Sequence, residues 1–131
     1  MRPIKFRGKS RHTGKWFYGN LYVEDSFGRT RICTPGRSCL DIDPKTVGQF
    51  IGLYDKDGKE IYEGDILRFG NSPSDVCEVK WNESIAAFCI RFYFDDEISI
   101  RLLGEWVECE KNIAIIGNIH DNPELMKGGE K

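Results

Sequence analysis

The sequence contains no long hydrophobic run. No stretch of about 18 or more apolar residues is present, so the sequence offers no candidate for a transmembrane helix. The first residues, MRPIKFRGKSR, are basic but are not followed by the apolar segment that a signal peptide needs. We therefore expect a cytoplasmic protein that has no contact with a membrane.

Close cysteine pairs are also lacking. A zinc site needs about four Cys or His ligands, usually supplied as close pairs, whereas the nearest cysteines, Cys33 and Cys39, are separated by five residues. We expect no metal and reduced thiols, with Cys77 and Cys89 packing as small hydrophobic residues. The five cysteines of the chain are Cys33, Cys39, Cys77, Cys89 and Cys109.

Catalytic motifs are scarce. His12 and His120 are the only histidines, and neither lies in a recognisable catalytic motif, although His120 and Asp121 could form an orienting pair. Gly48 and Gly52 are not followed by a helix, whose N-terminus a phosphate-binding glycine motif requires. The sequence therefore predicts no cofactor and no enzymatic activity.

Two acidic groups leave alternatives open. The run from Asp55 to Gly58 resembles the start of a calcium loop, but its glycine comes at position four rather than six, and Ile66 occupies the position of the bidentate Glu. A hairpin turn is the better interpretation. Glu60, Glu63 and Asp65 could supply carboxylates for a metal-dependent nuclease, although a solvated turn and strand explain them more simply.

What the sequence does contain is short alternating runs separated by turn residues, a pattern typical of β-strands. With 131 residues, of which 40% are hydrophobic, the chain can bury a core. We expect a mainly β protein with little helix, divided into an N-terminal β subdomain (1–46), a small barrel (47–125) and a loose tail (126–131). Strands are expected at 4–7, 15–23, 29–33, 51–54, 59–62, 66–68, 77–81, 86–94, 98–103 and 113–119, with helical turns at 44–46 and 122–125.

Some side chains are assigned to a face by the same alternation. Cys77, Val79 and Trp81 share one face of their strand, which leaves Glu78 and Lys80 exposed on the other. In the following strand Phe88, Ile90, Phe92 and Phe94 lie in register.

Charge is unevenly distributed. Residues 1–40 contain nine Lys and Arg against two acidic residues, a formal charge of +7, so the remainder carries −9 of the net −2. This basic segment either follows a phosphate backbone while its aromatic residues stack on bases, or packs against the acidic remainder or another subunit. The candidate binding surface consists of Arg7, Arg11, Trp16, Tyr18 and Tyr22.

Four segments resemble the YopX family, a group of small proteins encoded by phages and prophages. They are IKFR (4–7), WFYGNL (16–21), VGQFIGLYDKDGKEIYEGDI (47–66) and IIGNIHDNPEL (115–125). The resemblance implies an SH3-like barrel after an N-terminal β subdomain, self-association, and a bacterial host cell. It implies no catalytic residues.

We therefore predict a non-enzymatic phage or prophage accessory protein that acts as a self-associating binding module, with an unknown phage or host protein as a further partner. Nucleic-acid binding through the basic segment is the first alternative, and a metal-dependent nuclease is the second. The shared glycines and acids serve as scaffold in this interpretation. They are Gly48, Gly52, Asp55, Gly58, Glu63, Gly64, Asp65 and Gly117.

Overall fold

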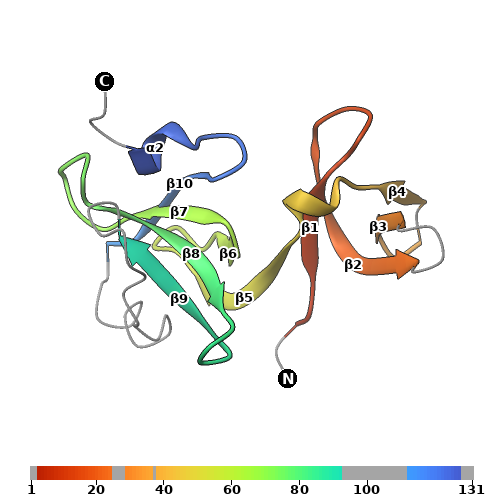
Figure 1. The fold of residues 1–131 in the computed structure, drawn as a ribbon, viewed down its shortest axis with the longest axis horizontal. Helices are drawn as coiled ribbons and strands as arrows, with labels where there is room; N and C mark the ends of the chain where they lie inside the picture. The colour runs from red at the N-terminus through yellow and green to blue at the C-terminus, as the bar shows by residue number, and fades with distance from the viewer. Residues whose placement is uncertain (1–2, 25–28, 37, 93–111, 128–131) are drawn as a thin grey trace. The chain divides into compact units, whose positions relative to one another are not determined.

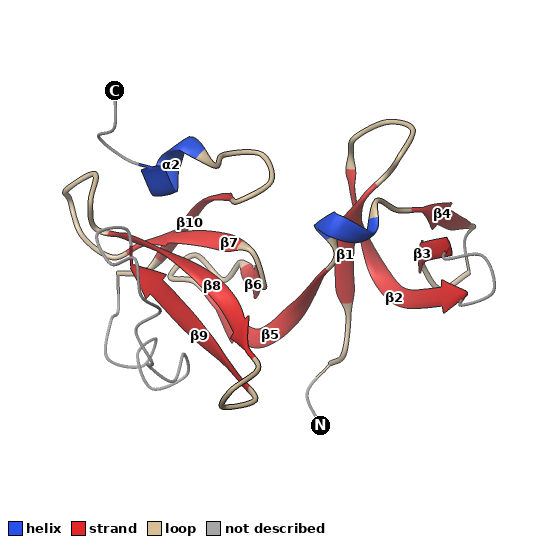
Figure 2. Cartoon of the chain, viewed as in Figure 1, coloured by secondary structure: helices blue, strands red, loops and turns tan. Residues whose placement is uncertain are grey.

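A computed structural model describes residues 3–24, 29–36, 38–92 and 112–127 of the chain. It is mainly β, with two antiparallel sheets and very little helix, as predicted (Figures 1 and 2). The chain divides into two compact units, which we call the N-terminal unit (Met1–Phe50) and the C-terminal unit (Ile51–Lys131). The predicted division between 46 and 47 lies close to this boundary and stays a prediction.

The N-terminal unit is an antiparallel meander in which each strand pairs with the next along the chain. The meander curls back on itself, so that Ser10, just after the first strand, forms a bridge with Ile42, just after the last strand. The amide of Asp43 also donates to the carbonyl of Lys9 at 2.9 Å. Its elements are β1 (Phe6–Lys9), β2 (Trp16–Glu24), β3 (Arg29–Cys33), β4 (Cys39–Asp41) and the 3₁₀ turn η1 (Pro44–Thr46).

The inner side of this curled meander holds a small apolar core. Ile32 and Ile42 are 1% and 0% exposed. Gly8 faces Ile42 so closely that a Cβ added at Gly8 would overlap the Cγ2 methyl group of Ile42. A residue without a side chain is therefore required where β1 passes over the core.

The C-terminal unit contains a four-stranded sheet in the order β10-β7-β8-β9 and a hairpin formed by β5 and β6. Strand β5 begins in the N-terminal unit, where Gly48 and Gln49 pair with β1. The elements are β5 (Gly48–Tyr54), β6 (Glu60–Tyr62), β7 (Asp65–Arg68), β8 (Val76–Asn82), β9 (Ala87–Phe92), β10 (Ala114–Asn118) and α2 (Glu124–Lys127).

Both faces of the four-stranded sheet are covered. On one face, the β5–β6 hairpin contributes Ile51 and Ile61 to a core that also contains Leu67, Cys77, Val79, Ile90 and Ile113. On the other face, α2 packs Leu125 and Met126 against the cluster of Ile66 and Val76. The burial of about seven side chains in the first cluster makes it the main core of the unit.

The packing of α2 on the four-stranded sheet explains one wrong prediction. Glu78 was expected to be exposed, but it is only 5% exposed, because it lies on the face of β8 that α2 covers. Its Oε1 accepts hydrogen bonds from Nε and Nη2 of Arg91 at 3.2 and 3.0 Å. The two residues are directly opposite in the β8–β9 register, so the buried charge is paired.

Other predictions have mixed outcomes. The first strand lies two residues later than predicted, and β4 was not predicted at all. The helical turn at 44–46 is confirmed, whereas the predicted strand 98–103 and Phe94 lie outside the described residues. In the part of the chain that the structure describes, the strand pairings do not close into a barrel, so the SH3-like barrel stays a prediction. No helix in those same ranges is long and apolar enough to cross a membrane.

Candidate binding surface

The predicted binding residues lie mostly on one face of the N-terminal sheet. Paired residues on adjacent antiparallel strands lie on the same face, and alternate residues along a strand do so too. Arg7 pairs with Tyr18, and Tyr22 pairs with Arg31, which in turn pairs with Asp41. We call this face, opposite the core of Ile32 and Ile42, the outer face; it comprises Arg7, Lys9, Trp16, Tyr18, Asn20, Tyr22, Glu24, Arg29, Arg31, Cys33, Cys39 and Asp41.

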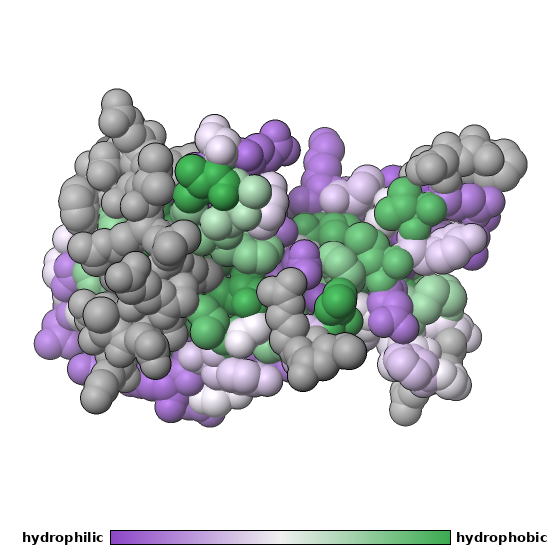
Figure 3. Space-filling view, turned by 90° about the horizontal axis from the view of Figure 1, so that it is seen from below, coloured by the Kyte–Doolittle hydropathy of each residue, from purple (hydrophilic) through white to green (hydrophobic). Residues whose placement is uncertain are grey.

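Two tyrosines dominate the exposed part of this face. Tyr18 and Tyr22 are 48% and 56% exposed, although both belong to a strand with paired neighbours on either side. Figure 3 shows that hydrophobic and hydrophilic residues are interspersed on the side of the N-terminal unit that it presents. A surface of exposed tyrosines among charged residues has the composition of a protein interface.

Arg7 and Trp16 lie deeper than expected for contact residues. Arg7 is 6% exposed, and its guanidinium carbon lies 4.6 Å from the centre of the Trp16 ring. The ammonium nitrogen of Lys9 lies 5.7 Å from the same ring. Both distances allow a cation–π interaction. The buried Arg7 side chain therefore packs against the ring of Trp16. Tyr18 and Tyr22 are the more accessible members of the predicted surface.

Arg11 belongs to the turn between β1 and β2 and is exposed. Its backbone amide donates to the carbonyl of Asp41 at 3.2 Å, and Nε2 of the neighbouring His12 lies 3.9 Å from Oδ2 of Asp41. The turn is therefore attached to β4, at the edge of the outer face. Of the five predicted residues, the register brings four together, and Arg11 lies beside them.

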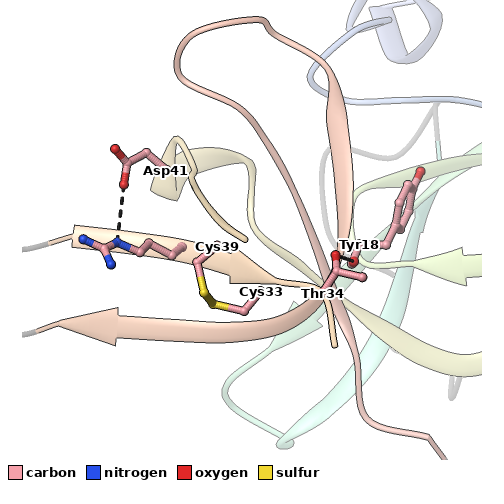
Figure 4. Close-up of a disulfide and its surroundings, with 6 residues drawn as sticks. Tyr18, Cys33, Thr34, Cys39 and Asp41 are labelled. Carbon is pink, nitrogen blue, oxygen red and sulfur yellow. Dashed lines mark hydrogen bonds and ion pairs between the residues drawn. A yellow bond between two sulfur atoms is a disulfide. The ribbon is translucent and has the colours of Figure 1, made fainter. Parts of the chain in front are cut away.

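This face also carries a disulfide that was not predicted from the sequence. Cys33 and Cys39 are directly opposite in the β3–β4 register and are bonded to each other (Figure 4), so the prediction that all thiols are reduced is wrong for this pair. Cys77 and Cys89 are free and buried, as predicted, and burial raises the pKa of the Cys77 thiol to about 12. Cys109 lies outside the described residues. The cysteines at both ends of a short Pro-Gly loop were a signal for this hairpin.

The residues shared with the YopX family have a different environment. Asp55 is 7% exposed, and its Oδ1 accepts hydrogen bonds from the amides of Asp57 and Lys59, both at 2.9 Å. Its Oδ2 accepts a third from Ile115 at 3.1 Å, which joins the β5–β6 turn to β10. Desolvation alone would raise the pKa of this carboxyl, but the three amide donors and the charge of Lys59 together lower it. Asp55 therefore has a structural function.

Asp65 and Gly64 also hold the backbone in place, and Gly58 has the φ of a turn. Asp65 is 1% exposed, and its Oδ2 accepts a hydrogen bond from the Tyr62 amide at 2.7 Å. The Gly64 amide donates to Val79 and its carbonyl accepts from Ile119, both at 2.9 Å. Gly58 has a φ of 81°, which the predicted hairpin turn needs. The remaining members are Gly48 and Gly52 in β5, Glu63 in the turn before β7, and Gly117 at a register shift in β10.

The carboxylates proposed for a nuclease do not converge. Oε1 of Glu60 accepts a hydrogen bond from the Tyr62 hydroxyl at 3.1 Å. Asp121, a candidate orienting partner of His120 and not one of these three carboxylates, accepts a hydrogen bond at Oδ2 from the Asn118 side chain at 3.2 Å. Among the residues described by the structure, no group of three or more His, Cys, Asp or Glu side chains is arranged to hold a metal ion. No observation on these residues favours hydrolysis.

Comparisons with known proteins place these observations in a family. Residues 5–127 match the model of a family described as YopX protein. The structure is similar to the crystal structure of protein EF1440 from Enterococcus faecalis, with a TM-score of 0.60 and 22% sequence identity over 97% of this chain and 100% of that chain. At this identity the likeness shows the fold alone. No curated protein matches the chain.

Proposed function

We propose, from the premise that the chain belongs to the YopX family, that it is a non-enzymatic binding module that self-associates through the outer face of its N-terminal sheet. The observation that carries the proposal is the exposure of Tyr18 and Tyr22 on one strand of that face. Exposed tyrosines are frequent energetic centres of protein interfaces. A phage or prophage origin, action in the bacterial cytoplasm, and a further phage or host partner belong to this proposal.

The charges of the outer face suit a contact between two copies. Nε of Arg31 lies 3.5 Å from Oδ1 of Asp41, and Arg29 is opposite Glu24 in the register. Basic and acidic groups are thus both present around the tyrosines. A face that contains both signs can be complementary to its own copy in a two-fold dimer.

Analytical ultracentrifugation over a range of concentrations tests self-association, with Tyr22→Ala and Tyr18→Ala as the variants. We expect each variant to weaken the self-association constant at least tenfold, an effect of about 1.4 kcal/mol that is typical of an interface tyrosine. Tyr54→Ala is the matched control, since Tyr54 is 50% exposed and lies at the end of β5. A monomeric wild type, or variants that associate as strongly as the control, would show that the assignment is wrong.

Nucleic-acid binding is the second candidate, because Lys9 lies opposite Trp16 in the β1–β2 register, Tyr18 lies two residues further along β2, and Arg11 is exposed in the turn after β1. Cations beside aromatic rings are the usual elements of a single-strand site. In fluorescence anisotropy with a labelled oligonucleotide, affinity should fall steeply with salt and with Arg11→Glu. Lys56→Glu, at an exposed position of the C-terminal unit, is the control. No binding at low salt would remove this candidate.

We further propose that the C-terminal unit is an SH3-like barrel. Support comes from the β5–β6 hairpin, which packs against the four-stranded sheet across the core that contains Ile61 and Ile90. Backbone nuclear Overhauser contacts that join the edge strands β6 and β9 into a continuous sheet are expected. Two sheets without such a connection would contradict the barrel.

A further inference from the structure

The disulfide between Cys33 and Cys39 lies within the proposed contact surface. The two residues form the row of the outer face that adjoins the row of Tyr22, Arg31 and Asp41, since Cys33 and Arg31 are two residues apart on β3. Cys39 is exposed and Cys33 is half-buried. A small reductant can therefore reach the bond without unfolding the sheet.

Backbone contacts hold β4 and the residue after it: the amide of Arg11 donates to the carbonyl of Asp41, and Ser10 forms a bridge with Ile42. The strand has only three residues, which form three register pairs with β3. The ion pair between Arg31 and Asp41 involves side chains that are 31% and 46% exposed, and exposed ion pairs contribute little. The disulfide adds a covalent link between β4 and β3 to these non-covalent contacts.

Thr34 extends this constraint toward the tyrosines. It follows Cys33 directly, and its Oγ1 donates a hydrogen bond to the backbone carbonyl of Tyr18 at 3.2 Å (Figure 4). Loosening the loop after Cys33 would therefore act on β2 at Tyr18, and loosening β4 would release Asp41 from Arg31. The first change would affect Tyr18 and the second would affect Arg31 and Asp41, and all three residues lie on the outer face.

We propose that Cys33 and Cys39 form a thiol–disulfide switch that orders β4 and thereby controls self-association through the outer face. The regulatory part rests on the proposed function. The oxidised form presents a pre-organised surface, and the reduced form loses affinity because ordering β4 then opposes binding. Disulfides in a reducing compartment are usually transient or redox-sensing, which agrees with the proposed cytoplasmic site of action.

The chemical step is thiol–disulfide exchange with a dithiol reductant. A thiolate of the reductant attacks one sulfur, which forms a mixed disulfide and releases the other cysteine as a thiolate. The second thiol of the reductant then displaces the remaining cysteine. Cys33 and Cys39 together gain two electrons and two protons, and the dithiol becomes a disulfide. Oxidation by a disulfide of higher potential reverses the step.

The sequence allows a direct test of the linkage. Trypsin cleaves after Arg31, Arg37 and Lys45, which separates ICTPGR from SCLDIDPK. After thiols are blocked and the unreduced protein is digested, mass spectrometry should find these two peptides as one linked species that dithiothreitol separates. Recovery of both peptides only in their blocked, unlinked form, even after mild oxidation, would overturn the switch.

The consequence for structure is tested by amide hydrogen exchange on the full chain. With dithiothreitol, exchange within residues 38–43 should accelerate at least tenfold, whereas exchange in β7 and β8 should not change. The Cys33→Ser/Cys39→Ser variant should exchange rapidly with and without dithiothreitol, which excludes an effect through the other three cysteines. Equal protection of residues 38–43 in the oxidised and reduced wild type would overturn the ordering of β4.

The consequence for association is tested by ultracentrifugation of the same samples. We expect the oxidised wild type to associate at least fivefold more tightly than the reduced wild type or the double Ser variant. If association is unchanged by reduction but is weakened by Tyr22→Ala, the switch is wrong and the proposed function stands. If the protein is monomeric in both redox states, the proposed function is wrong, and with it the control of association.

Discussion

The two units of this chain use their polar residues in opposite ways. In the C-terminal unit, the buried carboxylates of Asp55 and Asp65 accept backbone hydrogen bonds and fix the turns around a sheet that is covered on both faces. In the N-terminal unit, charged and aromatic side chains lie on the outer face of the sheet, and the small core of Ile32 and Ile42 lies on the opposite face.

This difference separates scaffold from surface. The segment from Val47 to Arg68, which carries the clearest family resemblance, contains β5, β6 and β7 and their turns. The carboxylates of Asp55 and Asp65 in this segment accept hydrogen bonds from backbone amides and hold its turns. The N-terminal unit carries the exposed Tyr18 and Tyr22 and the disulfide, and the proposed contact surface lies there.

The largest expected effect is the loss of Asp55. Asp55→Ala leaves three backbone amides of the C-terminal unit without their acceptor. At about 1 kcal/mol for each bond, we expect a loss of about 3 kcal/mol in the free energy of unfolding, measured by urea denaturation followed by circular dichroism. Asp57→Ala, at an exposed position of the same turn, is the control. A loss below about 1 kcal/mol would contradict the structural function of this carboxylate.

Gly8→Ala gives the corresponding test in the N-terminal unit. The added methyl group would overlap the Cγ2 methyl group of Ile42, and we expect destabilisation of about 2 kcal/mol from overpacking. Leucine lacks the branch at Cβ, so Ile42→Leu in the same chain should recover part of the loss. Denaturation of the two single variants and the double variant measures this coupling. Strictly additive losses would show that the two side chains do not interact.

Alternation along the strands predicted much of this fold. Strands 15–23 and 29–33 were placed within one residue, because their side chains alternate clearly and turn residues follow them. Strand β4 was missed since three residues after a Pro-Gly loop give no periodic signal. The burial of Glu78 was missed because it depends on α2, a short element about 45 residues later in the chain that propensity alone does not place against β8.

The candidate surface was predicted in composition but not in arrangement. Alternation put Trp16, Tyr18 and Tyr22 on one side of β2, and the register confirms that they share a face. It could not show that Arg7 is buried beside Trp16, or that Cys33 meets Cys39, because both depend on pairing between strands. Register is determined by the whole sheet, whereas alternation belongs to a single strand.

Removal of the disulfide should destabilise the N-terminal unit by about 2 kcal/mol, as the loop-closure entropy of a short loop allows. The sequence separation of the two cysteines is only 6, so the effect is at the lower end for disulfides. Thermal denaturation of the oxidised wild type and the Cys33→Ser/Cys39→Ser variant measures it. An unchanged midpoint would mean that β4 does not depend on the covalent bond.

Acid should weaken the C-terminal unit through Asp55. Its pKa in the folded protein lies below the ordinary value of 3.8, so its ionisation stabilises the fold fully above that value and ceases to do so as the pH falls through the lower, folded pKa. The difference in unfolding free energy between the wild type and Asp55→Asn should therefore shrink between about pH 5 and pH 2. A difference that stays constant over this range would contradict the lowered pKa.

The smallest expected effect on stability comes from the outer face itself. Because Tyr22 is 56% exposed, Tyr22→Ala should change the free energy of unfolding by no more than about 0.5 kcal/mol, the same as the control Tyr54→Ala. Self-association should nevertheless weaken in the Tyr22 variant alone. Urea denaturation and ultracentrifugation of the same preparations separate the two effects. If Tyr22→Ala destabilises the fold as strongly as Gly8→Ala, Tyr22 stabilises the N-terminal unit and does not serve a partner. The difference between a scaffold in the C-terminal unit and a contact surface in the N-terminal unit would then be wrong, because it depends most on Tyr22.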